Sequence, residues 1–182
     1  IKLRLGLKDP DEILELIPIF NRFPLDELMI HPRTGAQMYE GDVDLDRFGK
    51  CLEISSHTVV YNGDIDTVRK HRMLAGRFKS VHRWMIGRGL LGNPFLAEEI
   101  KGRTERPYEE KVRILRAFHD TLFTEYSQTL SGPAHITNKM KEFWTYTGSF
   151  LKDREKIRKS INKTHHRDQY IDAVHRIFEE SV

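Results

Sequence analysis

The sequence has a single cysteine and no long apolar run. The one cysteine, Cys51, cannot form an internal disulfide, which fits a reducing cytoplasm. The longest apolar runs, such as Val59 to Tyr61, are far too short to span a bilayer, and residues 1–6 have no apolar core of the kind that a signal peptide carries. We therefore expect a cytoplasmic protein that does not enter a membrane.

Internal repeats, low-complexity tracts and a strong charge of one sign are also absent. The 182 residues are 38% hydrophobic and 31% charged, with a formal net charge of +3, which is ordinary for a folded protein that leans polar. This length allows one good core or one and a half domains. Because the chain begins without Met and already inside a β-like alternation, we expect a fragment of something longer or an incomplete chain.

The first half of the sequence alternates short strand-like and helix-like segments. The expected strands are residues 1–5, 27–31, 58–61 and 81–86. The expected helices are one with Asp9 as N-cap and Pro10 at its first position, then 44–55, 66–75 and a short helix from near Asn93. Such alternation is typical of parallel βαβ units with right-handed crossovers.

The second half has only helical patterns. After a polar connector at residues 102–107, apolar residues recur at helical spacing. They are Tyr108, Val112, Leu115, Phe118, Leu122 and Tyr126. Further helices are expected at 135–147, 152–162 and 167–180, so the sequence predicts an α/β domain over residues 1–102 and a helical bundle over residues 103–182.

Two glycine-bearing loops follow the third and fourth expected strands. Their residues are Asn62, Gly63, Asp64, Gly87, Arg88 and Gly89. In a (β/α)₈ barrel the loops after the last two strands, with the start of a short helix, form the usual phosphate site, because glycines allow close approach of the backbone and helix N–H groups donate. Arg88 adds a planar, charged fork. An Asn-Gly pair also favours a hairpin turn, but a helix follows Ile65, so we predict a phosphorylated ligand at the open end of a parallel sheet.

Four segments together resemble the tRNA-dihydrouridine synthase family. They are residues 2–6, residues 31–34 with Gln37 and Tyr39, residues 62–65, and residues 85–89 with residues 92–94. Their order and spacing are similar to strands five to eight of that family's FMN-binding barrel, and residues 138–144 resemble part of its C-terminal RNA-binding domain. The resemblance implies the second half of a (β/α)₈ TIM barrel followed by an all-helical tRNA-binding domain.

The resemblance assigns cofactor contacts to the strand ends. It implies that Lys2 contacts FMN, that Arg4 lies in the flavin–substrate region, and that the two glycine loops hold the phosphate. Lys2 and Arg4 alternate on one strand, so both can point to the same face. His31 would contact FMN, and Arg33 would reach the phosphate or a nearby acid. The alternatives are solvated charges on a frayed strand, a half-buried strand-end histidine and, for Arg33, a surface ion pair.

Basic residues crowd the last helices, with aromatic residues nearby. The RNA-binding candidates are Lys139, Lys152, Arg154, Lys156, Arg158, Lys159 and Lys163. A basic face with aromatics suits a folded RNA, which proteins recognise by its shape and phosphates, although most charge runs are solvated helix faces. His165 and His166 have no partners at metal-ligand spacing, so we expect no zinc site.

The resemblance implies a flavin-dependent reduction of uridine to 5,6-dihydrouridine in tRNA, with NADPH as reductant. The uridine would be drawn out of the tRNA into the barrel mouth. The family's protonating cysteine lies in a segment that this sequence does not contain, and Cys51, in a helix-like stretch, cannot be carried over as that acid. We therefore expect this chain alone to be inactive.

Two alternatives stay open at this point. One is a non-catalytic RNA-binding or interaction module, and the other is a different FMN-dependent barrel oxidoreductase that acts on a small molecule. For partners, we expect tRNA and either the missing half of the barrel or a second copy that pairs with the exposed strand edges.

Overall fold

The chain forms two compact units. The computed structural model describes residues 1–103 and 106–181, and its units are Ile1–Gly89 and Leu90–Val182. The expected connector, residues 102–107, falls partly outside the described residues. None of the helices in the described ranges combines the length and apolar character that a bilayer crossing requires.

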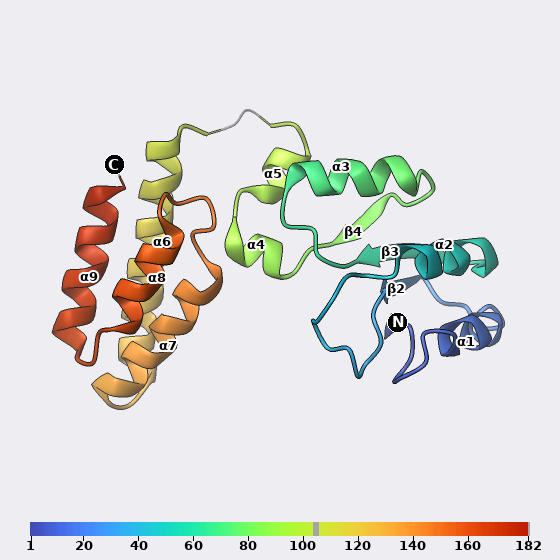
Figure 1. Cartoon of the computed structure of the whole chain (residues 1–182), viewed down its shortest axis with the longest axis horizontal. Coiled ribbons are helices and arrows are strands. Elements are labelled where there is room, and N and C mark those ends of the chain that lie inside the picture. The colour runs from blue at the N-terminus through green and yellow to red at the C-terminus, as the bar shows by residue number, and fades with distance from the viewer. Residues whose placement is uncertain (104–105, 182) are drawn as a thin grey trace. The chain divides into compact units, whose positions relative to one another are not determined.

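The first unit is a four-stranded parallel sheet with helices in the connections (Figure 1). Its elements are β1 (Lys2–Arg4), α1 (Glu12–Phe20), β2 (Glu27–His31), α2 (Leu45–Ile54), β3 (Thr58–Asn62), α3 (Val68–Arg77), β4 (Arg83–Met85) and the start of α4 (Arg88–Gly92). The strands lie in the order β1-β2-β3-β4, and all three pairings are parallel. This confirms the α/β class and the partial (β/α)₈ barrel expected from the sequence.

One face of the sheet is apolar and packs against the helices. Leu3, Ile30, Tyr61 and Trp84 are paired in one row across the four strands. The Tyr61 ring meets Phe48 of α2 edge-on, with 4.9 Å between ring centroids, and Trp84 meets a histidine of α3 at the same distance. Because side chains alternate along a strand, the neighbouring residues point to the opposite face.

The opposite face of the sheet carries the charged residues. Lys2, Met29, Val60 and Arg83 form one row across it. Arg83 donates to Glu27 on the same face over 2.7 Å. Parallel barrels turn such a face toward the barrel interior, so the sheet places the polar strand residues where a barrel holds its ligand.

The first helix starts later than the sequence predicts. Asp9 and Pro10 are not its N-cap and first residue, because Asp9 caps a separate turn in which its carboxylate accepts from the backbone N–H of Asp11 over 2.9 Å. The helix begins at Glu12, whose carboxylate accepts from the backbone N–H groups of the preceding loop. These two acceptors thus move the helix start by two residues, from Pro10 to Glu12.

The helix expected near Asn93 is two short helices. The first, α4, begins at Arg88, and the second, α5, spans Leu96–Ile100. Asn93 lies between them, where its side chain accepts from the backbone N–H of Phe95 over 3.1 Å. The outer strands β1 and β4 are also shorter than expected, since only their central residues are paired.

The second unit is a helical bundle. It contains α5, α6 (Tyr108–Thr129), α7 (Pro133–Tyr146), α8 (Arg154–Asn162) and α9 (Arg167–Glu180), close to the helices that the sequence predicts. The boundary between the two compact units lies after Gly89, whereas the sequence predicts a domain boundary after residue 102. Its reason is that the short helices contact the bundle: Lys111 donates to Glu99 over 2.7 Å, and the backbone N–H of Ser149 donates to Gly92 over 3.0 Å.

A polar network crosses the core of this bundle. Trp144 of α7 donates to the Tyr170 hydroxyl of α9 over 3.0 Å, and that hydroxyl lies 2.7 Å from His119 Nε2 of α6. His119 Nδ1 lies 2.9 Å from the carboxylate of Asp120, which only accepts. Burial lowers the pKa of His119, so the ring is neutral, its Nδ1–H donates to Asp120, and its Nε2 accepts from Tyr170.

Candidate functional site

The carboxyl ends of the strands bring the candidate residues to one level. Arg4 is paired with His31, and Asn62 is paired with Met85. The residues just before His31 and Asn62 are also paired with each other, so these four residues follow one another across the sheet. By alternation they share the charged face with Lys2, which is exposed.

Arg33, two residues beyond the end of β2, is the centre of a buried hydrogen-bond network. It is only 2% exposed. Its Nη2 donates to Asp64 Oδ2 and to the backbone carbonyl of Gly41, each over 2.5 Å, and its Nη1 lies 3.3 Å from His31 Nε2. The end of β2, the loop that follows it and the loop after β3 therefore converge on one guanidinium group, and the surface ion pair considered for Arg33 is wrong.

Asp64 joins the two glycine loops. Its second oxygen, Oδ1, accepts from Arg88 Nη2 over 2.8 Å, while Oδ2 accepts from Arg33. Asp64 adopts a left-handed backbone conformation with φ 45°, which a short polar side chain tolerates better than most. The carboxylate is thus bracketed by two arginines, from the loop after β2 and from the start of α4.

Tyr39 lies beside Arg88 and Arg4. The guanidinium carbon of Arg88 is 4.3 Å from the centroid of its ring, and that of Arg4 is 5.4 Å away. The His31 ring is 6.3 Å from the Tyr39 ring. Arg4 also donates to the backbone carbonyl of Thr34 over 2.7 Å, so the loop after β2 is held against the strand ends.

The glycines of the two loops have different surroundings. A Cβ on Gly63 would stand 3.0 Å from Val43, 3.2 Å from the Tyr61 hydroxyl and 3.5 Å from His31 Cδ2. A Cβ on Gly89 would stand 1.9 Å from the backbone carbonyl oxygen of Ile65, whereas one on Gly87 would meet nothing within 4 Å. Gly89 is therefore required by close packing, a side chain at position 63 would need Val43 to shift, and Gly87 leaves open space.

The electrostatics of the site favour a neutral histidine and an ionised carboxylate. Burial, then the charges of Arg4, Arg33 and Lys2, lower the pKa of His31 to about 4, against the opposing charge of Asp64. For Asp64, burial raises the pKa, but the hydrogen bond and charge of Arg33 outweigh it, and the net shift is downward. Near neutral pH the site therefore has an excess of positive charge and an uncharged imidazole.

Two buried polar atoms lie next to these residues without a hydrogen-bond partner in the described part of the chain. They are Arg33 Nε and the Tyr61 hydroxyl oxygen. Native proteins rarely bury such atoms unpaired. Asn62 differs, because its side chain donates to the backbone carbonyl of Met85 over 2.9 Å and so links β3 to β4.

The sequence-based candidates thus fall into two groups. The structure brings together His31, Arg33, Gly63, Asp64 and Arg88 by direct contact. Lys2 and Asn62 share their face of the sheet, and Gly87 and Gly89 flank Arg88 in the chain. Sequence reasoning gave no role to Tyr61 or to the Gly41 carbonyl; the long polar segment after β2 was the only signal for the latter.

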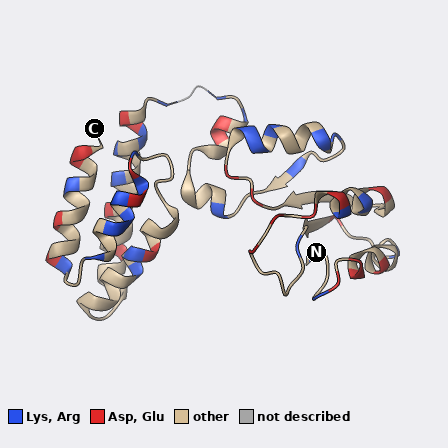
Figure 2. Cartoon of the chain, viewed as in Figure 1, with Lys and Arg blue, Asp and Glu red and all other residues tan. Residues whose placement is uncertain are grey.

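The basic candidates of the second unit are exposed except Lys139, which is partly exposed, and most lie on α8 (Figure 2). Several have local partners: Lys156 pairs with Glu180 over 3.1 Å, and Arg158 pairs with Glu155 over 2.9 Å. Lys139 pairs with Glu142 over 2.6 Å, as another exposed pair. Exposed pairs of this kind contribute only about 0–1 kcal/mol, so their cations can exchange a carboxylate for a phosphate at little cost.

The remaining candidates of this group have other contacts. Arg154 donates to the backbone carbonyl of Thr145 over 3.0 Å, and Lys152 Nζ lies 5.0 Å from the centroid of the Tyr108 ring. Of the aromatics considered for RNA contact, Trp144 is buried in the bundle core, while Tyr146 is exposed. The basic face is therefore a surface of cations with few aromatic rings beside it.

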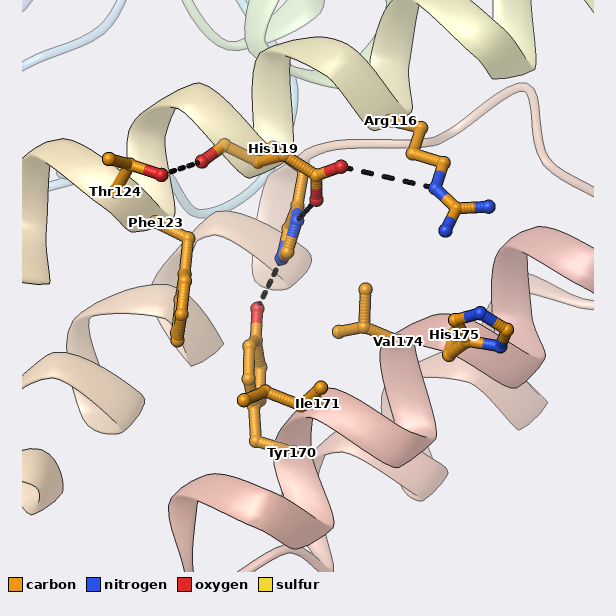
Figure 3. A pocket seen from close by; sticks show the side chains of 9 residues that line it. Arg116, His119, Phe123, Thr124, Tyr170, Ile171, Val174 and His175 are labelled. Atoms are coloured by element: carbon orange, nitrogen blue, oxygen red, sulfur yellow. Dashed lines mark hydrogen bonds and ion pairs between the residues drawn. The ribbon is translucent and has the colours of Figure 1, made fainter.

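The bundle also has a pocket of about 230 Å³ between α6 and α9 (Figure 3). Its wall includes the rings of Phe123 and Tyr170, which stack with 5.9 Å between centroids. At its rim, Arg116 pairs with Asp120 over 3.9 Å, and His175 Nδ1 lies 3.1 Å from the carboxylate of Glu179 on the same helix. It therefore lacks the positive excess of the α8 surface.

A parallel α/β sheet with a cationic strand-end site, followed by a helical bundle, defines a class of barrel protein with an appended helical domain. A family model described as "Dihydrouridine synthase (Dus)" matches residues 1–181. The chain belongs to the dihydrouridine synthase family.

Individual relatives agree with this membership. The tRNA-dihydrouridine synthase B of Pasteurella multocida is 33% identical over 107 residues, which are 58% of this chain and 32% of that protein. The tRNA-dihydrouridine synthase B of Vibrio cholerae is 27% identical over 190 residues, 98% of this chain and 56% of that protein. A probable tRNA-dihydrouridine synthase 2 of Bacillus subtilis is 33% identical over 138 residues, 73% of this chain and 41% of that protein. The chain thus spans about a third to a half of the length of these relatives.

Proposed function

We propose that this chain supplies the FMN-binding strand ends and the tRNA-binding helices of a tRNA-dihydrouridine synthase, which reduces uridine to 5,6-dihydrouridine with NADPH. The observation that carries the proposal is the arginine network at the strand ends. His31, Arg33, Asp64 and Arg88 converge there from the loops after β2, β3 and β4, and the family membership gives this cationic site its ligand class.

The residues present fit a flavin mononucleotide. Arg33 Nε is buried and has no hydrogen-bond partner in the described part of the chain, as expected where a polar ligand completes its hydrogen bonds. Arg88 would bind the phosphate, with the backbone of Gly63, Gly87 and Gly89 close by. Lys2 and His31 would hold the rest of the cofactor from the charged face of the sheet, and Arg4 would lie near the flavin and the substrate.

Asp64 has a different role from a direct cofactor contact. Both of its oxygens are engaged by arginines, and a free carboxylate beside a phosphate would repel it. Asp64 therefore holds Arg33 and Arg88 in place, and the site keeps an excess of positive charge for an anionic ligand.

Hydride donation to the uracil ring is the chemistry that such a flavin, reduced by NADPH, supplies when bound. The ring must also be protonated, and Cys51 is unsuited to that task. It lies on α2 in the core, fully buried, and burial raises the pKa of its thiol to about 11. We therefore propose that this chain alone does not reduce uridine in tRNA, and that Cys51→Ala in a complete enzyme leaves turnover nearly unchanged.

We propose that the exposed cations of α8 and its flanks contact tRNA phosphates. We also propose that the outer strands β1 and β4 pair with further strands, from the rest of a barrel or from a second copy. Light scattering on the concentrated chain tests whether two copies associate through these strands. A monomer at all concentrations would contradict pairing with a second copy.

FMN titration of the 182-residue chain, followed by quenching of flavin fluorescence, tests the cofactor site. We expect saturable binding that Arg88→Met weakens by about tenfold, because one charge-assisted contact to the phosphate is lost. Arg77→Met is the matched control, since Arg77 pairs with Asp46 on the outer helices. A chain that binds tRNA but no FMN would instead be the non-catalytic RNA-binding module.

A further inference from the structure

We propose that Arg33 is a positioning residue which, held by Asp64, fixes His31 in the tautomer that carries its proton on Nδ1, so that His31 offers a bound ligand an N–H donor. This inference rests on the proposed flavin site and deepens it. It states that the ligand atom facing His31 is an acceptor, such as a carbonyl or phosphate oxygen or an unprotonated ring nitrogen.

The direction of the Arg33–His31 contact follows from the chemistry of the two groups. A guanidinium group is always charged in proteins and has only N–H donors. Arg33 Nη1 lies 3.3 Å from His31 Nε2, so Nε2 must accept, and its lone pair must be free. A neutral imidazole with a free Nε2 has its proton on Nδ1.

The protonation state of His31 is consistent with this assignment. The groups that face it are Arg4 from β1, Arg33 and Asp64 from the two loops, and Lys2 from the start of β1. Three of these four are cations, and the ring is only 6% exposed. A second proton on the ring would stand against Arg33 Nη1, so the neutral form is kept near pH 7.

The other ring nitrogen is open to a ligand. His31 Nδ1 has no hydrogen-bond partner in the described ranges, and it is not among the fully buried polar atoms that lack one. The Cδ2 side of the ring faces Gly63, at 3.5 Å from the position of a glycine Cβ. A ligand therefore reaches His31 through Nδ1, while Nε2 is used by Arg33.

Arg33 can set the tautomer because it cannot turn away. Its Nη2 is held by Asp64 and by the Gly41 carbonyl, and Asp64 is held in turn by Arg88. Because two acceptors hold Nη2 in place, Nη1 of the same planar group stays directed toward the imidazole. The arginine thus sets the tautomer through its Nη1, separately from any contact that its Nε makes with the ligand.

Nuclear magnetic resonance of the ¹⁵N-labelled chain without ligand reads the tautomer directly. Long-range ¹H–¹⁵N correlations at pH 7.5 distinguish a protonated Nδ1 from a protonated Nε2, and His31→Asn identifies the His31 signals. We expect the Nδ1–H form in the wild-type chain and a shift to the Nε2–H form, which free imidazole favours, in Arg33→Met. Arg77→Met should leave the His31 signals unchanged.

Two results would overturn the proposal. One is the Nε2–H form in the wild-type chain, which requires no variant to fold. The other is an unchanged tautomer in a folded Arg33→Met chain or, if that variant is unfolded by circular dichroism, in a folded Arg33→Leu chain, which also lacks a donor.

FMN titration tests the donor that faces the ligand. Asparagine places its amide nitrogen near the position of Nδ1, and glutamine places it near that of Nε2. We expect His31→Asn to keep the FMN dissociation constant within about threefold and His31→Gln to raise it about tenfold, the effect of one lost hydrogen bond to a charged or polar acceptor. Equal loss in both variants, or the reverse order, would contradict a donor at Nδ1.

The two failures are distinguishable. If the wild-type chain binds no FMN, the proposed function fails, and with it the ligand assigned to Nδ1, while the tautomer is still read from the unliganded spectrum. If FMN binds and His31 carries its proton on Nε2, the flavin site stands and the role of Arg33 is wrong.

Discussion

Arg33 in the first unit and Arg158 in the second both lie next to a carboxylate, but in opposite surroundings. Arg33 is 2% exposed and binds groups from three separate segments. Arg158 is 50% exposed and pairs with Glu155, one turn away on the same helix. A buried ion pair that loses one partner leaves an uncompensated charge and costs about 3–5 kcal/mol, whereas an exposed pair contributes about 0–1 kcal/mol.

The two units therefore carry their positive charge in different ways. The first unit holds its arginines in fixed positions, as recognition of one ligand requires. The second unit presents exposed cations in weak pairs, which suits the proposed contact with a long polyanion. Substitutions should therefore act strongly and singly in the first unit, and weakly and additively in the second.

The largest effect is expected for Arg33→Met. The variant removes a buried cation and leaves Asp64 with Arg88 as its remaining partner, so the free energy of unfolding of the first unit should fall by about 3–5 kcal/mol, with FMN binding lost. Urea unfolding followed by the fluorescence of Trp84, in a chain with Trp144→Phe, measures this unit alone. Arg77→Met, at the Arg77–Asp46 surface pair, should change the same quantity by less than about 1 kcal/mol. Equal effects of the two variants would show that the burial of Arg33 has no consequence.

Next in size is Gly89→Ala. The new Cβ would stand 1.9 Å from the Ile65 carbonyl oxygen, so the backbone must shift, and we expect a loss of about 1–3 kcal/mol of unfolding free energy. Gly76→Ala on α3 is the contrasting variant, because its Cβ meets nothing within 4 Å and alanine is favoured in helices by roughly 1 kcal/mol. The same urea experiment should show changes of opposite sign, and a loss at both positions would argue against the close approach at Gly89.

The largest part of the pH dependence of stability in the first unit should come from His31, because its pKa is lowered further than that of His71 on α3, which burial also lowers. The pKa of His31 is lowered from about 6.5 when unfolded to about 4 when folded, so the unfolded state binds more protons in this window. Stability is therefore fully present above about pH 6.5 and is lost as the pH falls toward about 4, by on the order of 1–3 kcal/mol. His31→Gln should flatten that slope when thermal unfolding is followed by Trp84 fluorescence between pH 4 and 7. An unchanged slope would assign the pH effect to other groups.

The smallest single effects are expected on α8. Arg158→Ala and Lys156→Ala should each weaken tRNA binding a few-fold, reduce the slope of log K against log salt by about one, and change the unfolding free energy by less than about 0.5 kcal/mol. Glu155→Gln, which frees Arg158 from its acidic neighbour, should strengthen binding slightly. Filter binding at several salt concentrations measures these slopes, and effects at one salt alone would not support phosphate contacts.

Much of the fold follows from local sequence patterns. The order of strands and helices, the residues of α9 and the strand-end position of His31 are all set by nearest neighbours, and the structure confirms them. The helix start at Glu12 was missed because the Asp9 carboxylate accepts from the backbone N–H of Asp11 in a separate turn, while the Glu12 carboxylate accepts from backbone N–H groups of the preceding loop. Sequence patterns alone do not show which of two nearby carboxylates will cap the helix.

The contacts within the candidate site follow much less from the sequence. Arg33 and Asp64 are 31 positions apart, and only the register of β2 against β3 brings their loops together. The sequence indicated that both belong near a phosphate, but it could not show that both carboxylate oxygens of Asp64 accept hydrogen bonds from arginines. Tyr39 next to Arg88 depends in the same way on the path of a long loop.

The chain of hydrogen bonds from Trp144 through Tyr170 to His119 has a consequence for how the bundle assembles. Apolar side chains pack almost equally well if one helix slides or rotates by a turn, so an apolar core alone selects poorly among neighbouring arrangements. Here α6, α7 and α9 each contribute one polar atom, and these atoms meet in only one alignment. Any displaced arrangement would enclose them unpaired, at a cost of about 1–3 kcal/mol for each. The network therefore favours a single alignment of the three helices over its neighbours.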